Sequence, residues 1–222
     1  MKAIALLGGP QEEWPQTLAA NIKKAHKKGA LIMASDRGSL FLLELGIIPD
    51  VALGDYDSLS DSERQRVEKE VKDMRYSNPI KDFTDSEMLF YAAFIDYKVD
   101  TLTVYGATGG RLDHFLVNMY AVLKAPFNRF KERIEFIDNQ NIVRFFGSGK
   151  HLIPYNAEYK YLGIGTLTAT KDFSIKNARY DLAPVNLSVP TMYSSNEYFN
   201  KQDIEVSCSV GTLIVINSRD KK

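Results

Sequence analysis

The sequence predicts two domains of different fold class, an α/β domain over residues 1–138 and an all-β domain over residues 139–222. In the first part, short apolar runs alternate with helix-like segments, which is typical of βαβ units around a mostly parallel sheet. From about Asn139 no helical periodicity longer than two turns remains, and short β-branched and aromatic runs are separated by Gly, Asn, Asp and Pro. A length of 222 residues is enough for both domains.

Each element of the first domain can be placed from its pattern. Short apolar runs predict β-strands at residues 3–7, 30–34, 51–53, 101–105 and 134–137. Amphipathic or charged stretches predict helices at residues 15–27, 39–45, about 61–72, 84–96 and 113–124. Thr84 and the residues from Ser58 to Asp61 offer side chains that cap helix N-termini. Right-handed crossovers place the helices on the faces of the sheet, so we expect three layers.

The second domain reads as a small antiparallel sandwich or barrel. Its last two apolar runs, residues 204–210 and 212–216, flank Gly211 and predict a terminal hairpin. Cys208 is the single cysteine and alternates with Val206, which predicts a buried core position. One cysteine excludes an internal disulfide and a cysteine-based zinc site.

Charge and hydropathy exclude several classes of partner. Lys plus Arg and Asp plus Glu both number 28, so the formal net charge is zero. We therefore expect no nucleic-acid or membrane partner, and any phosphate site must be built locally from a few groups. No run approaches the roughly 20 apolar residues that span a bilayer, and the N-terminal apolar run is too short for a signal peptide. The expected compartment is the cytoplasm.

Polar side chains gather where the predicted strands of the α/β domain end. They lie in four segments, residues 35–38, 54–58, 81–85 and 106–114. Because open α/β sheets bind ligands at the carboxyl ends of their strands, we expect these loops to converge on one crevice.

Carboxylates dominate three of these loops. Asp55 and Asp57 are separated by one residue, and in extended backbone both would lie on one side and repel each other without a cation between them. Clustered carboxylates suit Mg²⁺, which also binds substrate phosphates. The alternative is that Asp57 caps the next helix, and Asp82 and Asp85 are equally compatible with a helix first turn.

The fourth loop suits an anion. Gly109 and Gly110 let backbone N–H groups approach a phosphate at a helix start, and Arg111 adds a bidentate donor, although a Gly-Gly pair is also a simple turn signal. His114 is read as a helix-start residue or, less favoured, a general base. No Walker, G-x-G-x-x-G or kinase signature is present. The pattern alone indicates a metal-dependent nucleotide enzyme.

In order along the chain, five segments resemble thiamine pyrophosphokinase: Asp36-Arg37-Gly38, Leu45-Gly46-Ile47-Ile48-Pro49-Asp50, Gly54-Asp55-Tyr56-Asp57-Ser58, Lys81-Asp82-Phe83-Thr84-Asp85 and Gly109-Gly110-Arg111-Leu112-Asp113-His114. The resemblance implies transfer of the pyrophosphoryl group of ATP to the hydroxyl of thiamine, giving thiamine diphosphate and AMP. It implies Mg²⁺ at Asp55, Asp57 and Asp85, with Arg111 joining them as catalytic residues. It also implies ATP-site roles for Asp36, Arg37, Gly54, Asp82, Thr84, Gly109, Gly110, Arg111 and Asp113.

The same resemblance implies a thiamine site in the β domain, formed by Tyr180, Ser194, Ser195 and Asn196. An aromatic face suits a cationic thiazolium, and hydroxyl or amide groups suit the aminopyrimidine edge. The family commonly has Trp where this chain has Tyr180. The alternative for Tyr180 is a residue packed in a sheet.

The resemblance further implies a homodimer in which the β domain of one subunit completes the site of the other. The short join near Asn139 favours this arrangement, because it limits how far the β domain can fold back over its own chain. Two other functions remain open at this point. One is an ATP pyrophosphokinase with a different acceptor alcohol, and the other is a nucleotide-sensing module without turnover.

Overall fold

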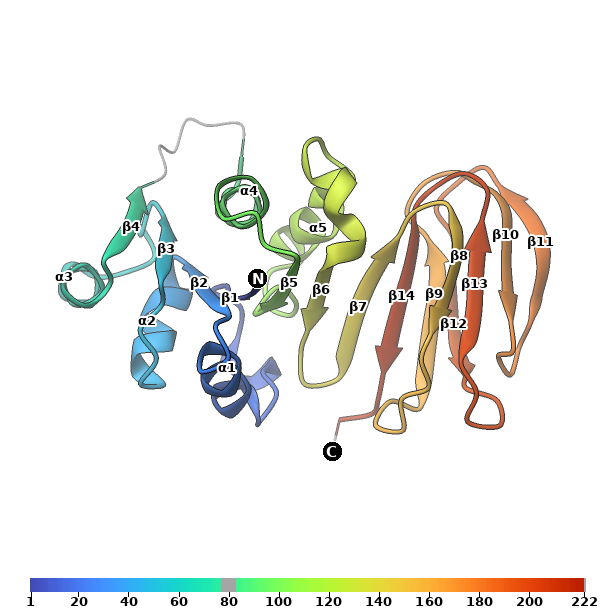
Figure 1. Ribbon diagram of the computed structural model, residues 1–222, viewed down its shortest axis with the longest axis horizontal. Helices are drawn as coiled ribbons and strands as arrows, with labels where there is room; N and C mark the ends of the chain where they lie inside the picture. The colour runs from blue at the N-terminus through green and yellow to red at the C-terminus, as the bar shows by residue number, and fades with distance from the viewer. Residues whose placement is uncertain (77–82, 222) are drawn as a thin grey trace. The chain divides into compact units, whose positions relative to one another are not determined.

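The computed structural model describes residues 1–76 and 83–221 (Figure 1). The chain divides into two units, Met1–Asn139 and Gln140–Lys222, here called the α/β unit and the β unit. Within the described ranges, no helix is long and apolar enough to cross a membrane.

A parallel sheet forms the centre of the α/β unit. Its strands are β1 (Lys2–Leu6), β2 (Leu31–Ser35), β3 (Val51–Gly54), β4 (Asp73–Tyr76), β5 (Thr101–Tyr105) and β6 (Ile134–Ile137). They lie in the order β6-β5-β1-β2-β3-β4, and each neighbouring pair is parallel. The prediction of a mostly parallel sheet is confirmed.

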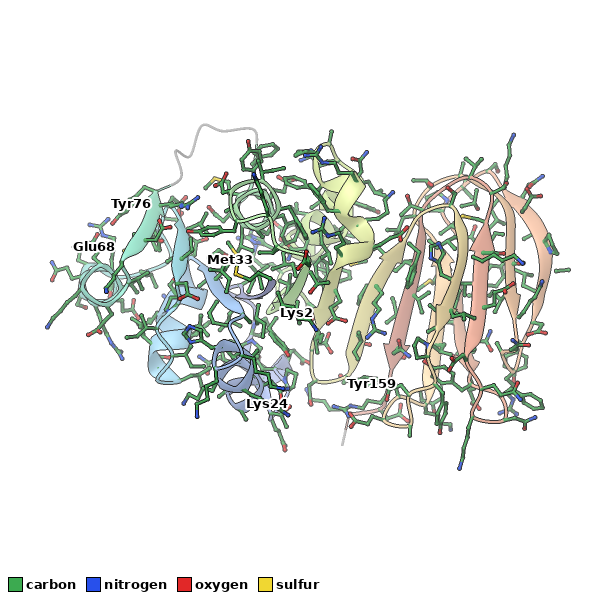
Figure 2. The ribbon with its side chains drawn as sticks, viewed as in Figure 1. Lys2, Lys24, Met33, Glu68, Tyr76 and Tyr159 are labelled. Carbon is green, nitrogen blue, oxygen red and sulfur yellow. The ribbon has the colours of Figure 1, made fainter. Side chains whose placement is uncertain are left out.

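Helices cover this sheet. They are α1 (Leu18–His26), α2 (Arg37–Glu44), α3 (Asp61–Glu70), α4 (Asp85–Tyr91) with its π-helical continuation η2 (Ala92–Asp96), α5 (Leu112–Ala121) and the 3-10 segments η1 (Gln11–Glu13) and η3 (Phe127–Arg133). Ile32 and Ala34 pack with α1 and α2 in one buried cluster. The intervening Met33 faces the opposite side, because strand side chains alternate, and it is fully buried there (Figure 2). Helix α4 packs on β2 and β3 and contacts α5, so the unit has the predicted three layers.

The strand order reverses direction between β1 and β5. The chain steps from β1 through β2 and β3 to β4, and then returns to the other side of β1 with β5. Such a reversal opens a crevice at the carboxyl ends of the two strands involved. The loops after β1 and β5 meet closely there, since a Cβ added to Gly9 would lie 2.3 Å from Gly106 O.

Strand β4 was not predicted from the sequence. Its four residues are Asp73-Met74-Arg75-Tyr76, and such polar sequences are unusual for a buried parallel strand. The strand lies at the sheet edge, where Arg75 binds Asp73 and Asp96. Tyr76 donates a hydrogen bond to Glu68 of α3 at 2.6 Å (Figure 2). Charged side chains are expected on an edge strand because they prevent further strand pairing.

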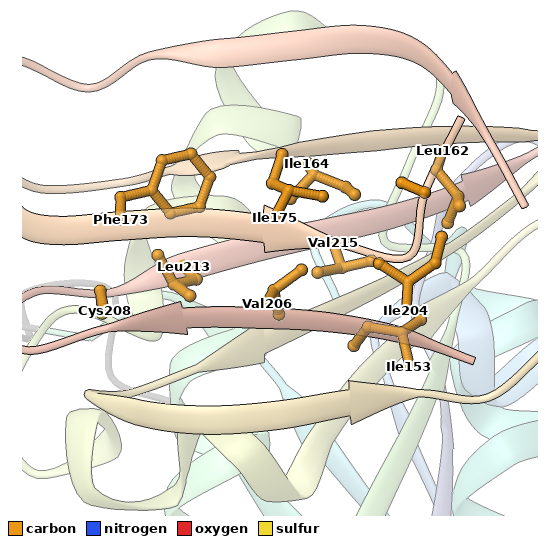
Figure 3. Close-up of a cluster of buried hydrophobic side chains, with 11 residues drawn as sticks. Ile153, Leu162, Ile164, Phe173, Ile175, Ile204, Val206, Cys208, Leu213 and Val215 are labelled. Atoms are coloured by element: carbon orange, nitrogen blue, oxygen red, sulfur yellow. The ribbon is translucent and has the colours of Figure 1, made fainter. Parts of the chain in front are cut away.

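Two antiparallel sheets form the β unit. One has the order β12 (Met192–Glu197), β9 (Tyr161–Thr166), β14 (Leu213–Ser218), β7 (Asn141–Phe146). The other has the order β11 (Leu182–Leu187), β10 (Thr170–Lys176), β13 (Ile204–Cys208), β8 (Gly149–Ile153). Buried side chains from both sheets form one core, which includes Leu162, Phe173 and Val206 (Figure 3). The predicted all-β domain is therefore a sandwich.

The predicted terminal hairpin is wrong. Strand β13 pairs with β10 and β8, whereas β14 pairs with β7 and β9 in the other sheet. Cys208 and Leu213 both enter the core between the sheets, so the chain must change sheets between them (Figure 3). Gly211 makes this possible, because its φ is 122° and a Cβ there would lie 2.3 Å from the Thr170 side chain. Cys208 is 4% exposed, which confirms its predicted core position.

Candidate active site

Asp36 links the carboxyl ends of β2 and β3. Its φ of 45° is rare for a residue other than glycine, and such strain is typical of functional sites. Its N–H donates to Leu53 O at 3.0 Å, and its Oδ1 accepts from Tyr56 N at 3.1 Å. A Cβ at Gly54 would lie 2.0 Å from Asp36 Oδ1, so glycine is needed at the end of β3 for the carboxyl group to fit.

Asp55 and Asp57 lie in a turn, and the expectation of extended backbone between them is wrong. Tyr56 has a φ of 59°, and Asp57 N donates to Asp55 Oδ1 at 3.0 Å. The cause is the Tyr56 ring, which is 1% exposed and packs with Leu40 and Val67 between α2 and α3. Burying this ring leaves Asp55 half-buried and Asp57 exposed.

Asp85 is the first residue of α4, and a capping box fixes this helix end. Thr84 Oγ1 accepts a hydrogen bond from Glu87 N at 3.4 Å, while Glu87 Oε2 accepts one from Thr84 N at 2.9 Å. Glu87 is 1% exposed, and its Oε1 accepts a hydrogen bond from Lys124 Nζ at 2.5 Å. Thr84 therefore has a clear capping role. Asp82 lies outside the described residues.

The structure brings together four predicted carboxylates, Asp36, Asp55, Asp57 and Asp85, here called the acidic cluster. Burial, the charge of Asp85 and a hydrogen bond with it raise the pKa of Asp36 to about 8. A hydrogen bond with Asp55 and the negative charge of that residue raise the pKa of Asp57. Both shifts have the sign expected where like charges crowd together. The predicted convergence of the loops after β2 and β3 with the start of α4 is thus observed.

The donor set of the acidic cluster fits Mg²⁺. Carboxylate oxygens are its preferred protein ligands, and the neighbouring carboxylates of Asp55, Asp57 and Asp85 bring such oxygens to one place. Among the described residues, no group of three or more His, Cys, Asp or Glu side chains is placed to hold a metal ion alone. Mg²⁺ is commonly held by one or two carboxylates together with water and substrate phosphates, so a partial protein site suits this ion.

The loop after β5 carries the predicted anion-binding residues. Gly109 and Gly110 have φ values of 77° and 65°, which favour glycine. Arg111, the N-cap of α5, donates to Asp113 from Nε at 3.1 Å and from Nη2 at 2.6 Å. This pairing lowers the pKa of Asp113 to about 2. His114 donates its backbone N–H to Asp113 at 3.0 Å and is exposed, which fits a helix-start residue.

Arg37 supports the loop between β3 and α3. Its guanidinium donates to the Ser58 carbonyl and lies 3.5 Å from Glu63 Oε1. Glu63 in turn forms a capping box with Ser60 at the start of α3. These contacts show how a residue expected at the nucleotide site also holds the turn that carries Asp57.

The loop after β1 was missed as part of the site. Gly9 contacts the Gly106 backbone, and the side chain of Pro10 lies beside Gly109 and Gly110. This loop therefore joins the predicted anion loop to the rest of the carboxyl edge. The signal was present in the sequence, because Gly8-Gly9-Pro10 directly follows a buried strand.

The four predicted thiamine residues lie in the β unit. Tyr180 is 59% exposed in the turn between β10 and β11, so it is not packed within a sheet. Ser194 and Ser195 are exposed on β12, where Ser195 has a φ of 60°. Asn196 is 3% exposed, and its amide binds the backbone of Tyr180. The structure thus brings Tyr180 and Asn196 into contact.

Comparison with known proteins covers both units. Residues 22–136 match the family model described as the catalytic domain of thiamin pyrophosphokinase, and residues 150–213 match its vitamin B1 binding domain. Thiamine pyrophosphokinase of Bacillus subtilis (strain 168) is 29% identical over 222 residues, which is 99% of this chain and 100% of the relative.

Solved structures agree. A thiamin pyrophosphokinase family protein from Enterococcus faecalis superimposes with a TM-score of 0.88 at 29% identity, covering 100% of both chains. Thiamin pyrophosphokinase from Geobacillus thermodenitrificans gives a TM-score of 0.83 at 27% identity, covering 100% of this chain and 99% of that one. The catalytic-domain match alone spans more than half of the sequence. The chain belongs to the thiamin pyrophosphokinase family.

Proposed function

We propose that this enzyme carries out the reaction of its family, with Asp55, Asp57 and Asp85 holding Mg²⁺ together with water and the phosphates of ATP. In that reaction the thiamine hydroxyl oxygen attacks the β-phosphorus of ATP, the bond from this phosphorus to the α,β-bridging oxygen breaks, and AMP leaves as the hydroxyl proton is released. The observation that carries the metal assignment is the acidic cluster itself, in which Asp85 lies beside Asp36 and Asp55 lies beside Asp57.

The acidic cluster would bind and orient the phosphate end of ATP. A bound Mg²⁺ would supply positive charge that neutralises the phosphate oxygens. Asp36 and Gly54 hold the turn that carries Asp55 and Asp57, since Asp36 accepts from Tyr56 N and only glycine fits beside its carboxyl group. Asp85 is fixed by the capping box of α4. These are the residues we assign to the phosphate end of the site.

The loop after β5 would bind a second part of the nucleotide. Gly109 and Gly110 expose backbone at the start of α5, and Arg111 is 74% exposed. A bound phosphate would accept hydrogen bonds from the Arg111 guanidinium together with Asp113, or in place of Asp113. Backbone N–H groups and the helix N-terminus would add partial positive charge.

Thiamine would be recognised by the β unit. The exposed ring of Tyr180 offers a face to the thiazolium cation, and the exposed hydroxyls of Ser194 and Ser195 offer donors and acceptors to the aminopyrimidine. The match of residues 150–213 to the vitamin B1 binding domain supports this assignment.

We also propose a homodimer with shared sites, as the family resemblance implies. Co-refolding an Asp55→Asn chain with a Tyr180→Ala/Asn196→Ala chain tests it. With random exchange, half of the dimers are mixed and each holds one intact site, so about a quarter of wild-type activity should return. If mixed dimers form and stay inactive, each site is built within one chain.

Thiamine-dependent release of AMP from ATP tests the proposal as a whole. We expect AMP in the presence of Mg²⁺ and thiamine, a strong decrease with EDTA, and a strong decrease in the Asp55→Asn protein. AMP release with another hydroxylated heterocycle but not with thiamine would favour a different acceptor. ATP binding without AMP release would favour a nucleotide sensor.

A further inference from the structure

The turn that carries Tyr180 is fixed by backbone contacts on both sides of this residue. Asp181 Oδ1 accepts a hydrogen bond from Ala178 N at 3.0 Å. Arg179 N donates to Glu197 O at 2.9 Å, which ties the turn to the end of β12. The Tyr180 ring nevertheless remains largely exposed. The backbone is therefore held while the ring stays accessible to a ligand.

Asn196 supplies the remaining contacts from a buried position. Its Nδ2 donates to Tyr180 O at 2.8 Å, and its Oδ1 accepts from Tyr180 N at 3.1 Å and from Glu197 N at 2.9 Å. The carboxamide thus binds the N–H and C=O of one residue, as a paired strand would. Two backbone N–H groups already use the Oδ1 atom, so its acceptor capacity is filled.

A β-bulge contains the two serines that precede Asn196. The pairing of β12 with β9 shifts between Tyr193 and Asn196, and Ser195 adopts its φ of 60° within this shift. A bulge changes the direction of the side chains that follow it. Ser194 and Ser195 are consequently exposed, whereas Asn196 is buried. The three residues are adjacent in sequence but have different environments.

We infer that Asn196 is a positioning residue of the thiamine site that acts through Tyr180 and does not bind thiamine. The inference rests on the proposed function, in which the Tyr180 ring contacts thiamine. An asparagine is needed because its short side chain both donates to Tyr180 O and accepts from Tyr180 N. Aspartate lacks the donor, and glutamine is longer by one methylene group.

A double-mutant cycle in the full-length protein tests this inference. We expect Asn196→Ala to raise the KM for thiamine about tenfold, because its two hydrogen bonds to Tyr180 are lost, and to leave the KM for ATP within about twofold. In a Tyr180→Ala background, Asn196→Ala should change the KM for thiamine by less than about twofold, because the ring through which it acts is absent. If the rise in the KM for thiamine in the double variant equals the product of the rises in the two single variants, Asn196 binds thiamine independently and the inference is overturned.

Asn217→Ala is the matched control. Asn217 is 1% exposed on β14 in the same sheet, and its Nδ2 donates to the Tyr198 hydroxyl at 2.7 Å. We expect this variant to lower the Tm as Asn196→Ala does, with the KM for thiamine within about twofold of wild type. An equal rise in KM in the control would assign the effect to general loosening of the β unit and would refute the inference.

Fluorescence anisotropy gives a readout independent of activity. With Trp14→Phe removing the chain's single tryptophan, Tyr180→Trp places one indole on the turn. Asn196→Ala should lower the fluorescence anisotropy of this indole. If the Asn196→Ala protein fails to fold, Asn196→Asp is measured in its place. Unchanged anisotropy in the folded variant would overturn the inference. If Tyr180→Ala itself leaves the KM for thiamine unchanged, the proposed role of Tyr180 fails instead, whatever the anisotropy shows.

Discussion

At the acidic cluster, carboxylates from separate loops lie close together. At the Tyr180 turn, by contrast, the buried amide of Asn196 forms hydrogen bonds with the backbone of Tyr180, whose ring is exposed. The first arrangement raises the pKa of Asp36 to about 8, because burial and the charge of Asp85 both oppose its ionisation. The second involves no charge at Asn196, whose Nδ2 and Oδ1 both bind Tyr180. The acidic cluster gathers like charges, whereas the Tyr180 turn has its hydrogen bonds in place.

Substitutions at the two sites should therefore change the stability of the protein in opposite directions. Neutralising a carboxylate in the acidic cluster removes repulsion, so the metal-free protein should become more stable while activity is lost. Removing Asn196 leaves buried backbone groups without partners, so stability should fall together with thiamine use. Measuring Tm and activity on the same variants tests the comparison.

The largest effect is expected at the proposed metal ligands Asp55 and Asp57. Asp55→Asn or Asp57→Asn should lower turnover at least about a hundredfold, because the charge that holds the cation at the reacting phosphate is reduced. The Tm in EDTA should be unchanged or raised, since repulsion within the cluster is relieved. Normal activity of Asp55→Asn at saturating Mg²⁺ would contradict the assignment.

A large effect on stability is expected at Gly54. The added Cβ of Gly54→Ala would lie 2.0 Å from Asp36 Oδ1, and the φ of 143° is strained for alanine. Gly29→Ala is the control, because φ is 82° there and no atom lies within 4 Å of the added Cβ. Gly54→Ala should lower the unfolding free energy about 1–3 kcal/mol more than Gly29→Ala does in urea titrations. Equal losses of unfolding free energy in the two variants would mean that the close contact with Asp36 contributes nothing to the effect of Gly54→Ala.

A smaller effect, limited to one substrate, is expected at Tyr180. Tyr180→Ala should weaken thiamine use about 10- to 100-fold through loss of an aromatic face for a cation, with the KM for ATP unchanged. Tyr180→Phe and Tyr180→Trp should have only mild effects on thiamine use, because both keep an aromatic ring at this position. Steady-state kinetics with each substrate varied in turn would measure this. Equal losses for both substrates would indicate a structural role.

The last effect is a dependence of stability on pH. The pKa of Asp36 is raised above its unfolded value of 3.8 to about 8, so its stabilising contribution is present below pH 3.8 and is lost as the pH rises towards 8. Asp36→Asn removes this titration. In EDTA, the stability of Asp36→Asn relative to wild type should therefore increase between about pH 4 and pH 8 in urea unfolding. A difference in unfolding free energy between Asp36→Asn and wild type that stays constant with pH would be inconsistent with a raised pKa of Asp36.

Much of the α/β unit could be predicted because its signals are local. The strand over residues 101–105 and the cap at Thr84 follow from residue type and spacing, and the structure has both. Strand β4 could not be predicted, because Asp73 and Arg75 interrupt any apolar run and the strand is fixed by its pairing with β3. The prediction of a terminal hairpin failed for a related reason, since local turn chemistry at Gly211 does not specify which sheet the next strand joins.

The candidate sites show the same limit. The convergence of Asp36 with Asp85 was expected from strand ends, but the turn at Tyr56 depends on burial of its ring among distant helices. The partners of Asn196 are equally distant, because Tyr180 lies 16 residues away in sequence. Residue types indicated which groups are reactive. The tertiary contacts determine which of these groups are exposed, as Tyr180 is, and which are buried and support a neighbour, as Asn196 does.

The proposed function requires that the acidic cluster binds a divalent cation together with the phosphates of ATP. Electron paramagnetic resonance with Mn²⁺ as the probe, in the presence of a nonhydrolysable ATP analogue, measures this directly by separating free ion from protein-bound ion. We expect tight Mn²⁺ binding in wild type and in Tyr180→Ala, and at least about tenfold weaker binding in Asp55→Asn. Asp55→Asn and Asp57→Asn proteins that bind Mn²⁺ as tightly as wild type would contradict it.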